Sequence, residues 1–138
     1  MRLLLDTCVI IDWLTDADPF ERNVWDILND PDTKLYVSAE TARELIVSFN
    51  NKKLLSKYWK TAEEMLVAMK EEAMVDILPI SERTMFTYSR LTLNEAMDHR
   101  DPSDHVIIAH AITEHITLLS SDQKFPFYRS QGLELIEY

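Results

Sequence analysis

Two short apolar runs in this 138-residue chain, residues 3–5 and 116–119, are each followed closely by an aspartate, Asp6 and Asp122. Such runs are too short for buried helices and are typical of strands that are buried on both faces of a sheet. The carboxyl ends of these strands are where open α/β sheets bind their ligands. We therefore expect both aspartates at one edge of a parallel sheet.

Strand-like segments alternate with helical ones along the whole chain, without any hairpin signal. Strands are expected at residues 3–5, 35–37, 75–78, 116–119 and 133–136. Helices fill the intervals, and their starts are indicated by capping residues, namely Asp18, Ser38, Ser81 and Asp101. This pattern predicts an α/β fold in which helices cover both faces of a parallel sheet of four to five strands. We expect a single domain over residues 1–138.

Composition excludes several functional classes. The chain has a formal charge of −10, one cysteine (Cys8) and one glycine (Gly132). A lone cysteine forms no internal disulfide and favours a cytoplasmic protein. No motif supports Cys8 as a nucleophile, so we interpret it as a small packing residue. One glycine leaves no glycine-rich phosphate loop, and we find no membrane span or signal peptide.

Four carboxylates are candidates for a metal site. Asp6 and Asp122 follow apolar strands, Asp104 begins an apolar helix, and Glu44 lies beyond the first turn of the helix that starts at Ser38. If they converge, their charges repel one another unless cations or protons intervene. Mg²⁺ and Mn²⁺ prefer oxygen ligands and would remove this conflict. Cations held there would also bridge to phosphate, so the acidic charge does not exclude a nucleic-acid substrate.

Each aspartate also has a structural interpretation. Asp101 fits the N-cap position before Pro102, and Asp104 would be the reciprocal capping acid or, equally, a metal ligand. Asp6 fits a cap of the first helix, and Asp122 fits a turn residue. The recurrence of acids at equivalent strand ends favours function.

Other residues with a possible role are fewer. The four histidines lack the spacing of a zinc site; His105 would touch substrate or simply be exposed. Residues 50–60 hold the basic cluster of the chain, including Lys52 and Lys53, which is either a binding surface for RNA or protein or a solvated helix face. Three apolar side chains are expected in the core, namely Leu66, Met69 and Met74.

Four segments resemble, in their order, the PIN-domain nucleases, and within them the toxins of bacterial type II toxin–antitoxin pairs. The segments are Leu-Leu-Leu-Asp6-Thr, Ser-Ala-Glu-Thr-Ala-Arg-Glu44-Leu, Arg-Asp-Pro-Ser-Asp104-His and Leu-Leu-Ser-Ser-Asp122-Gln-Lys-Phe. The resemblance implies a three-layer α/β/α sandwich with a central parallel sheet. It also implies that Asp6, Glu44, Asp104 and Asp122 surround Mg²⁺ or Mn²⁺ and that activated water hydrolyses RNA. An antitoxin would inhibit the protein by covering the groove that holds these acids, and the protein would be a homodimer.

The resemblance assigns roles to the acids. Asp6 would hold the principal metal, with Asp104 and Asp122 as co-ligands, and Glu44 would position water or bind a second metal. Ser121 would hydrogen-bond a ligand carboxylate or a water. One departure is that close relatives often have phenylalanine and arginine where this chain has Ser103 and His105, which removes a potential phosphate contact.

Other functions remain possible on the sequence alone. A catalytically silent PIN-like domain that binds protein or RNA would keep the same acids. A phosphoacceptor receiver domain needs adjacent acids after its first strand, and an Asp-x-Asp phosphatase needs a second aspartate at position 8. Thr7 and Cys8 follow Asp6 in this chain, which argues against both.

Overall fold

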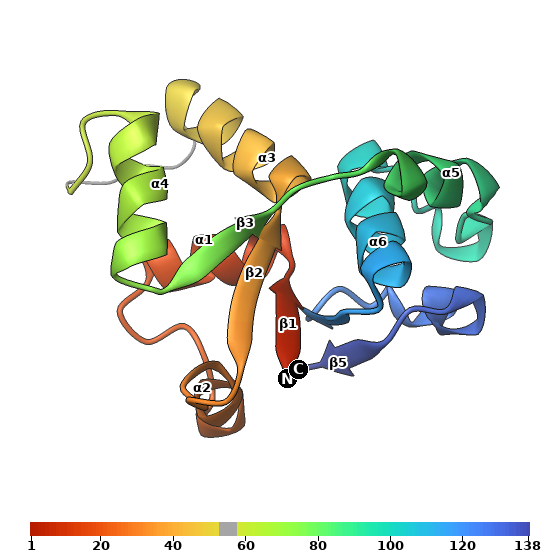
Figure 1. Cartoon of the computed structure of the whole chain (residues 1–138), viewed down its shortest axis with the longest axis horizontal. Coiled ribbons are helices and arrows are strands. Elements are labelled where there is room, and N and C mark those ends of the chain that lie inside the picture. Colours follow the sequence, from red (N-terminus) through yellow and green to blue (C-terminus); the bar gives the residue numbers. More distant parts are fainter. Residues whose placement is uncertain (53–57) are drawn as a thin grey trace.

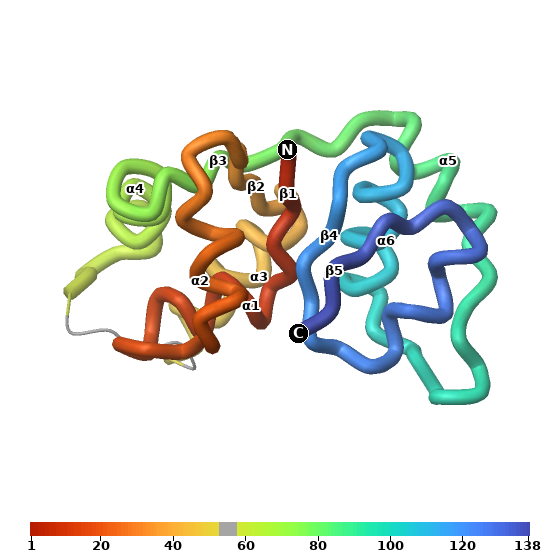
Figure 2. The backbone as a smooth tube through the Cα atoms, turned by 90° about the horizontal axis from the view of Figure 1, so that it is seen from below, coloured from red at the N-terminus to blue at the C-terminus, as the bar shows by residue number. Residues whose placement is uncertain are grey.

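The central feature of the computed structural model, which describes residues 1–52 and 58–138, is a sheet with the strand order β3-β2-β1-β4-β5 (Figure 1). The strands are β1 (Arg2–Leu5), β2 (Lys34–Ser38), β3 (Val75–Leu78), β4 (Thr117–Ser120) and β5 (Leu135–Glu137). Every strand pairing in these residues is parallel. β1 is the central strand, and its Leu4 pairs with Tyr36 of β2 and Leu118 of β4 (Figure 2).

The three leucines of β1 pack alternately against the two faces of the sheet, and none of them is exposed. Leu3 and Leu5 belong to a core formed with α1 (Thr7–Thr15), α2 (Arg22–Leu28), α3 (Ala39–Asn50) and α4 (Ala62–Glu71). Leu4 belongs to a second core, formed with α6 (Pro102–Glu114) and the 3-10 helix η2 (Pro126–Gln131). Alternate side chains of a strand point to opposite faces, so a central strand supplies both cores.

The helices form the outer layers of a three-layer α/β/α sandwich, as predicted. α5 (Glu82–Arg90) packs along α6, and α3 contacts both α4 and α6 (Figure 1). A short 3-10 helix, η1 (Glu95–Met97), lies between α5 and α6 in the chain. Within the described residues, every helix is too short or too polar to cross a membrane.

Three of the predicted helix caps are confirmed by their positions and hydrogen bonds. Ser38 accepts from the amide of Glu40 at the start of α3. Asp101 accepts from the amide of Ser103 at the start of α6. Asp6 accepts from the amide of Thr7 at the start of α1. These bonds satisfy amide donors that have no partner within the first turn of a helix.

The predicted helix start at Asp18 was wrong. α2 begins at Arg22, and Glu21 occupies its cap position without a side-chain hydrogen bond. Asp18 instead accepts a hydrogen bond from the indole nitrogen of Trp25, at 3.2 Å. Phe20 is buried against the ring of Trp25. Packing of Phe20 and Trp25 into the α1–α4 core therefore overrides the local capping signal.

The basic cluster does not form a helix face in the residues that the structure describes. α3 ends at Asn50, and Lys52 is exposed with a positive φ of 58°. Trp59 packs against the α1–α4 core. Lys53 lies outside the described residues, so its predicted role is not tested.

Met74 is not a core residue. Its side chain is 70% exposed, at a backbone φ of 55° that ends the turn before β3. Met69 is fully buried and Leu66 packs against the same core, as expected.

Candidate metal centre

Carboxylates gather at the carboxyl edge of the sheet, because the elements that carry them begin or end there. Asp6 directly follows β1, and Asp122 follows β4 by two residues. Glu44 lies in the second turn of α3, which begins directly after β2. Asp104 lies in the first turn of α6. Since β2, β1 and β4 are parallel neighbours, the carboxyl ends of the three strands share one edge.

Asp6 is the most buried of these acids, with 4% of its surface exposed. Its Oδ2 accepts from the hydroxyl of Ser120 at 2.7 Å and from the thiol of Cys8 at 3.3 Å. Burial raises the pKa of Asp6, the hydrogen bonds oppose this rise, and the charge of Asp122 adds to it. The carboxylate is thus held in one orientation by donors on both sides.

Glu44 is linked to the first turn of α1. The hydroxyl of Thr7 donates to Oε1 of Glu44 at 2.7 Å, and it also lies 2.9 Å from the hydroxyl of Thr41. Since Thr7 has a single hydroxyl hydrogen, it accepts from Thr41. Burial is the main cause that raises the pKa of Glu44, and the charges of Asp101, Glu40 and Asp6 raise it further.

Asp104 has the most perturbed acidity of the group. Burial, followed by the charges of Asp101, Asp6, Asp122 and Glu44, raises the pKa of its carboxyl from 3.8 to about 8. Its Oδ2 lies 2.9 Å from Nε2 of His99. Asp104 therefore bonds the histidine five residues before it, and the reciprocal capping bond that was one alternative is not among the contacts of Asp104 in the described residues.

Asp122 completes the cluster on the loop after β4. Its Oδ1 accepts from the amide of Lys124 at 2.9 Å, and its own amide donates to the Ser120 hydroxyl at 3.1 Å. Ligand atoms of Asp104, Asp122 and His99 all lie within 4.8 Å of one another. Asp122 thus combines the predicted turn role with a place beside Asp104.

The acids fit a hard divalent cation. Carboxylate oxygens are the available donors of Asp6, Glu44, Asp104 and Asp122, and oxygen donors suit Mg²⁺ and Mn²⁺. Burial, followed by the charges of neighbouring carboxylates, raises the pKa of Asp6, Glu44 and Asp104. Mutual repulsion of this kind is relieved when a cation binds. The exposed acidic side chains elsewhere in the described residues are not brought together in a buried cluster of this kind.

Comparison with known proteins identifies the family. A model of the PIN domain matches residues 3–130. The chain belongs to the PIN domain family. No curated protein matches the chain.

Several solved structures have the same PIN fold. The chain resembles VapBC2 from Rickettsia felis, which was solved with a fragment of its promoter DNA (TM-score 0.73, 20% identity, 99% of this chain and 98% of that chain). It resembles VapBC-1 from nontypeable Haemophilus influenzae (TM-score 0.73, 21% identity, 99% and 98%). It also resembles VapBC-5 from Mycobacterium tuberculosis, a member of the VapBC family of toxin–antitoxin systems (TM-score 0.61, 21% identity, 99% and 98%).

Two weaker residue predictions concern Ser121, whose role stays a prediction, and His105. Ser121 is exposed, whereas its neighbour Ser120 is buried and donates to Asp6. One interpretation expected His105 to be exposed, but it is buried. Its burial leaves little surface for contact with substrate. It is 3% exposed, and its ring packs 4.5 Å from the ring of His99.

Cys8 behaves as the sequence suggested. Burial and the charge of Asp6 raise the pKa of its thiol to about 12. It therefore stays protonated at neutral pH, and its hydrogen is donated to Asp6. A protonated thiol is a poor nucleophile.

Sequence reasoning missed the residues that orient the acids. Ser120, Thr7 and His99 each bond a carboxylate of the cluster. A polar residue at the end of an otherwise apolar strand was a usable signal for Ser120, because a buried hydroxyl needs a partner. His99 lies in a polar connection whose burial no local pattern indicates.

Proposed function

We propose that this PIN domain is a metal-dependent endoribonuclease, and that it is the toxin of a toxin–antitoxin pair. The observation that carries the proposal is the placement of Asp6, Glu44, Asp104 and Asp122 at one edge of the sheet, where burial and then neighbouring carboxylate charges raise the pKa of Asp6, Glu44 and Asp104. The family and the VapBC structures support it. RNA is the substrate expected from the resemblance.

The four acids would together bind the cation and position the attacking water. Asp6, which Ser120 and the Thr7 amide orient, would be the principal ligand. Asp104 and Asp122 would complete the ligand set, directly or through water. Glu44 has Oε1 bonded to Thr7, so Oε2 would accept a proton from water or bind a second ion. Mg²⁺ or Mn²⁺, when bound, would lower the pKa of water and stabilise negative charge on the phosphate.

The decisive test is RNA cleavage with a matched set of variants. Wild-type protein should cut single-stranded or structured RNA in Mn²⁺ or Mg²⁺ and stop when a chelator is added. Asp6→Asn and Asp104→Asn should lower the rate about 100-fold or more. Asp98→Asn is the matched control, because Asp98 is an exposed acid that pairs with Arg100.

The same experiment separates an enzyme from a silent binding module. Full activity in either ligand variant, or persistent activity in excess chelator, would contradict the proposed chemistry. Calorimetric titration with Mn²⁺ provides a second measurement, because a scaffold that acts through partner contacts alone has no need for tight metal binding. A homodimer, which light scattering would detect, stays a prediction.

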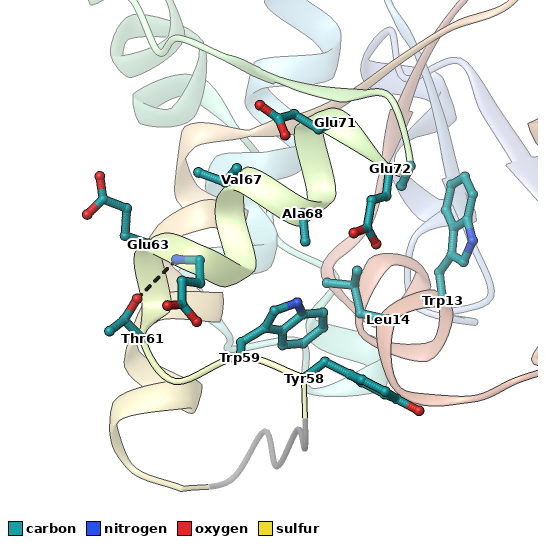
Figure 3. Close-up of a pocket in the computed structure, with 12 residues that line it drawn as sticks. Trp13, Leu14, Tyr58, Trp59, Thr61, Glu63, Val67, Ala68, Glu71 and Glu72 are labelled. Atoms are coloured by element: carbon teal, nitrogen blue, oxygen red, sulfur yellow. Dashed lines mark hydrogen bonds between the residues drawn. The ribbon is translucent and has the colours of Figure 1, made fainter.

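An antitoxin would bind an aromatic groove next to α4. This pocket, of about 950 Å³, is lined by Trp13 and Leu14 of α1, by Tyr58 and Trp59, and by the exposed side of α4 (Figure 3). Acids stand around it on α4 and just beyond it, namely Glu63, Glu64, Glu71 and Glu72. Apolar walls with an acidic rim fit a partner segment that carries aromatic or aliphatic side chains flanked by lysine or arginine.

Charge reversal tests this docking site. Glu71→Lys combined with Glu72→Lys should weaken the complex with the protein encoded by the neighbouring reading frame about tenfold or more, and salt should reduce the difference. Glu82→Lys on α5 is the matched control. Equal binding by all three proteins would place the antitoxin elsewhere.

A further inference from the structure

A series of hydrogen bonds leads to Asp104 through three buried residues. The amide of Asn94 donates to the Tyr128 hydroxyl oxygen at 3.0 Å. That oxygen lies 2.9 Å from Nδ1 of His99, and Nε2 of His99 lies 2.9 Å from Oδ2 of Asp104. Tyr128, His99 and Asn94 are each at most 3% exposed. Water is therefore excluded from these three residues.

The contacts of Tyr128 fix which ring nitrogen of His99 carries hydrogen. In the described part of the chain, the hydroxyl contacts Asn94 and His99. The Asn94 amide is a donor, so the hydroxyl hydrogen has His99 Nδ1 as its acceptor. Nδ1 then carries no hydrogen of its own. The ring hydrogen is on Nε2, and it is donated to Asp104.

This tautomer matters because Nε2 stands among the candidate metal ligands. Nε2 of His99 and carboxylate oxygens of Asp104 and Asp122 lie within 4.8 Å of one another. An imidazole nitrogen without hydrogen is a strong ligand for Zn²⁺ and other transition metals, whereas a protonated one cannot coordinate. The position alone would allow His99 to be a ligand.

We propose that Tyr128 and Asn94 make His99 a hydrogen-bond donor to Asp104 and thereby keep its ring out of the coordination sphere. His99 is then a positioning residue, and the site offers oxygen ligands alone to the cation. Such a site favours Mg²⁺ and Mn²⁺ over Zn²⁺. The proposal rests on the metal site of the proposed function and adds what selects the ion.

Asn94 extends the same network to the second acid. Its Nδ2 donates to the backbone carbonyl of Lys124 at 3.1 Å, and the amide of Lys124 donates to Asp122. Its Oδ1 accepts from the amide of Met97. One buried side chain thus holds the loop that carries Asp122, while its backbone amide orients Tyr128. The network fixes Asp104 and Asp122 relative to each other.

The direct test is nitrogen NMR of protein labelled at histidine, with Mg²⁺ or Zn²⁺ added. Wild-type His99 should show hydrogen on Nε2 and none on Nδ1, and Mg²⁺ should leave this unchanged. In Tyr128→Phe the ring is free to exchange tautomers. Its Mg²⁺ affinity should fall about tenfold or more, as for other residues that orient ligands, and its Zn²⁺ affinity should rise.

Tyr36→Phe is the matched control for loss of a hydroxyl, because Tyr36 is the middle residue of β2 and its ring lies beside Lys34. His99→Gln provides a conservative rescue, since its amide keeps an N–H donor for Asp104. It should retain more Mg²⁺ affinity than His99→Leu. Equal affinities in these two variants would contradict the positioning role.

The outcomes separate this proposal from the nuclease assignment. Hydrogen on Nδ1 in the wild type, or a His99 ring that coordinates Mg²⁺, overturns the proposal even if RNA is cleaved. This measurement needs no variant, so a Tyr128→Phe protein that fails to fold does not prevent it. Hydrogen on Nε2 with no Mg²⁺ binding overturns both the metal site and the selection of its ion.

Discussion

The hydroxyl of Ser120 lies 2.7 Å from Oδ2 of Asp6, although the two residues are 114 positions apart in the chain. Ser120 ends β4 and Asp6 follows β1, so parallel pairing of these strands creates the contact. Both side chains are buried. The bond therefore joins the first strand to the fourth at the point where the acids gather.

Ser120→Ala should lower the free energy of unfolding by about 2 kcal/mol, because a buried carboxylate loses a donor. Mn²⁺ affinity should fall in the same variant, since Asp6 is no longer held in one orientation. Ser130→Ala is the control, because Ser130 is exposed. Urea titration and calorimetry measure the two effects, and equal stability of the two variants would contradict the role given to Ser120.

The metal-free protein should lose stability as pH rises from about 4 to 8. The pKa of Asp104 is about 8 in the folded state against an ordinary value of 3.8, so in this range the folded state binds more protons than the unfolded state. Stability falls with pH wherever that is so. Urea unfolding in chelator at several pH values measures the slope, and Asp104→Asn should flatten it.

Added Mg²⁺ should reverse this loss at pH 8, by about 2.7 kcal/mol at one hundred times its dissociation constant. The reversal should be absent from Asp104→Asn. If unfolding free energy depends on pH with the same slope in the wild type and in Asp104→Asn, then Asp104 titrates normally and the acids do not converge.

Arg43 is expected to contact the RNA backbone. Its side chain is 57% exposed, and it donates to Ser103 at 3.0 Å and to Glu40 at the edge of the acid cluster. Position 105, where the resemblance led us to expect arginine, holds a buried histidine in this chain. Arg43→Ala should raise KM several-fold at low salt and change kcat little. Arg90→Ala on α5 is the control, and an unchanged KM would exclude the contact.

His110 is expected to stabilise the fold without taking part in catalysis. It is fully buried between the hydroxyl of Ser38, 2.9 Å from Nδ1, and the carbonyl of Pro79, 3.1 Å from Nε2. His110→Leu removes the acceptor of the Ser38 hydroxyl hydrogen and the donor to the Pro79 carbonyl, and it should cost about 1–3 kcal/mol. The exposed His115 provides a control as His115→Asn, since asparagine tolerates its positive φ.

The same histidine should contribute to acid sensitivity. Burial lowers the pKa of His110 below its ordinary value of 6.5. The unfolded state then binds the extra proton first, so this contribution to stability is present above pH 6.5 and is lost as pH falls below it. The difference in unfolding free energy between wild type and His110→Leu should therefore shrink as pH falls from 7 to 5, as measured by urea titrations.

The layered fold could be predicted from local patterns because each strand and most helix starts are encoded nearby. The leucines of β1 and the caps Ser38 and Asp101 are examples, and the structure places them as expected. The start of α2 could not be predicted, because the Phe20 and Trp25 rings fix that segment through contacts. Local propensity yields to tertiary packing in such places.

The positions of the acids could be predicted, but the residues that orient them could not. Asp6 and Asp122 follow recognisable strands, so sheet topology alone brings them to one edge. Ser120 and Ser121 are adjacent and chemically alike, and strand register decides which of them is buried. The bond between His99 and Asp104 depends on a connection that has little regular structure.

The central place of β1 has a consequence for the order in which the protein matures during translation. β1 is made first, but its pairing with β4 must wait until the ribosome has extended the chain past Ser120. A nascent chain thus carries Asp6 and Glu44 before it carries Asp122. The proposed metal site is completed only when β4 has been synthesised and has paired with β1.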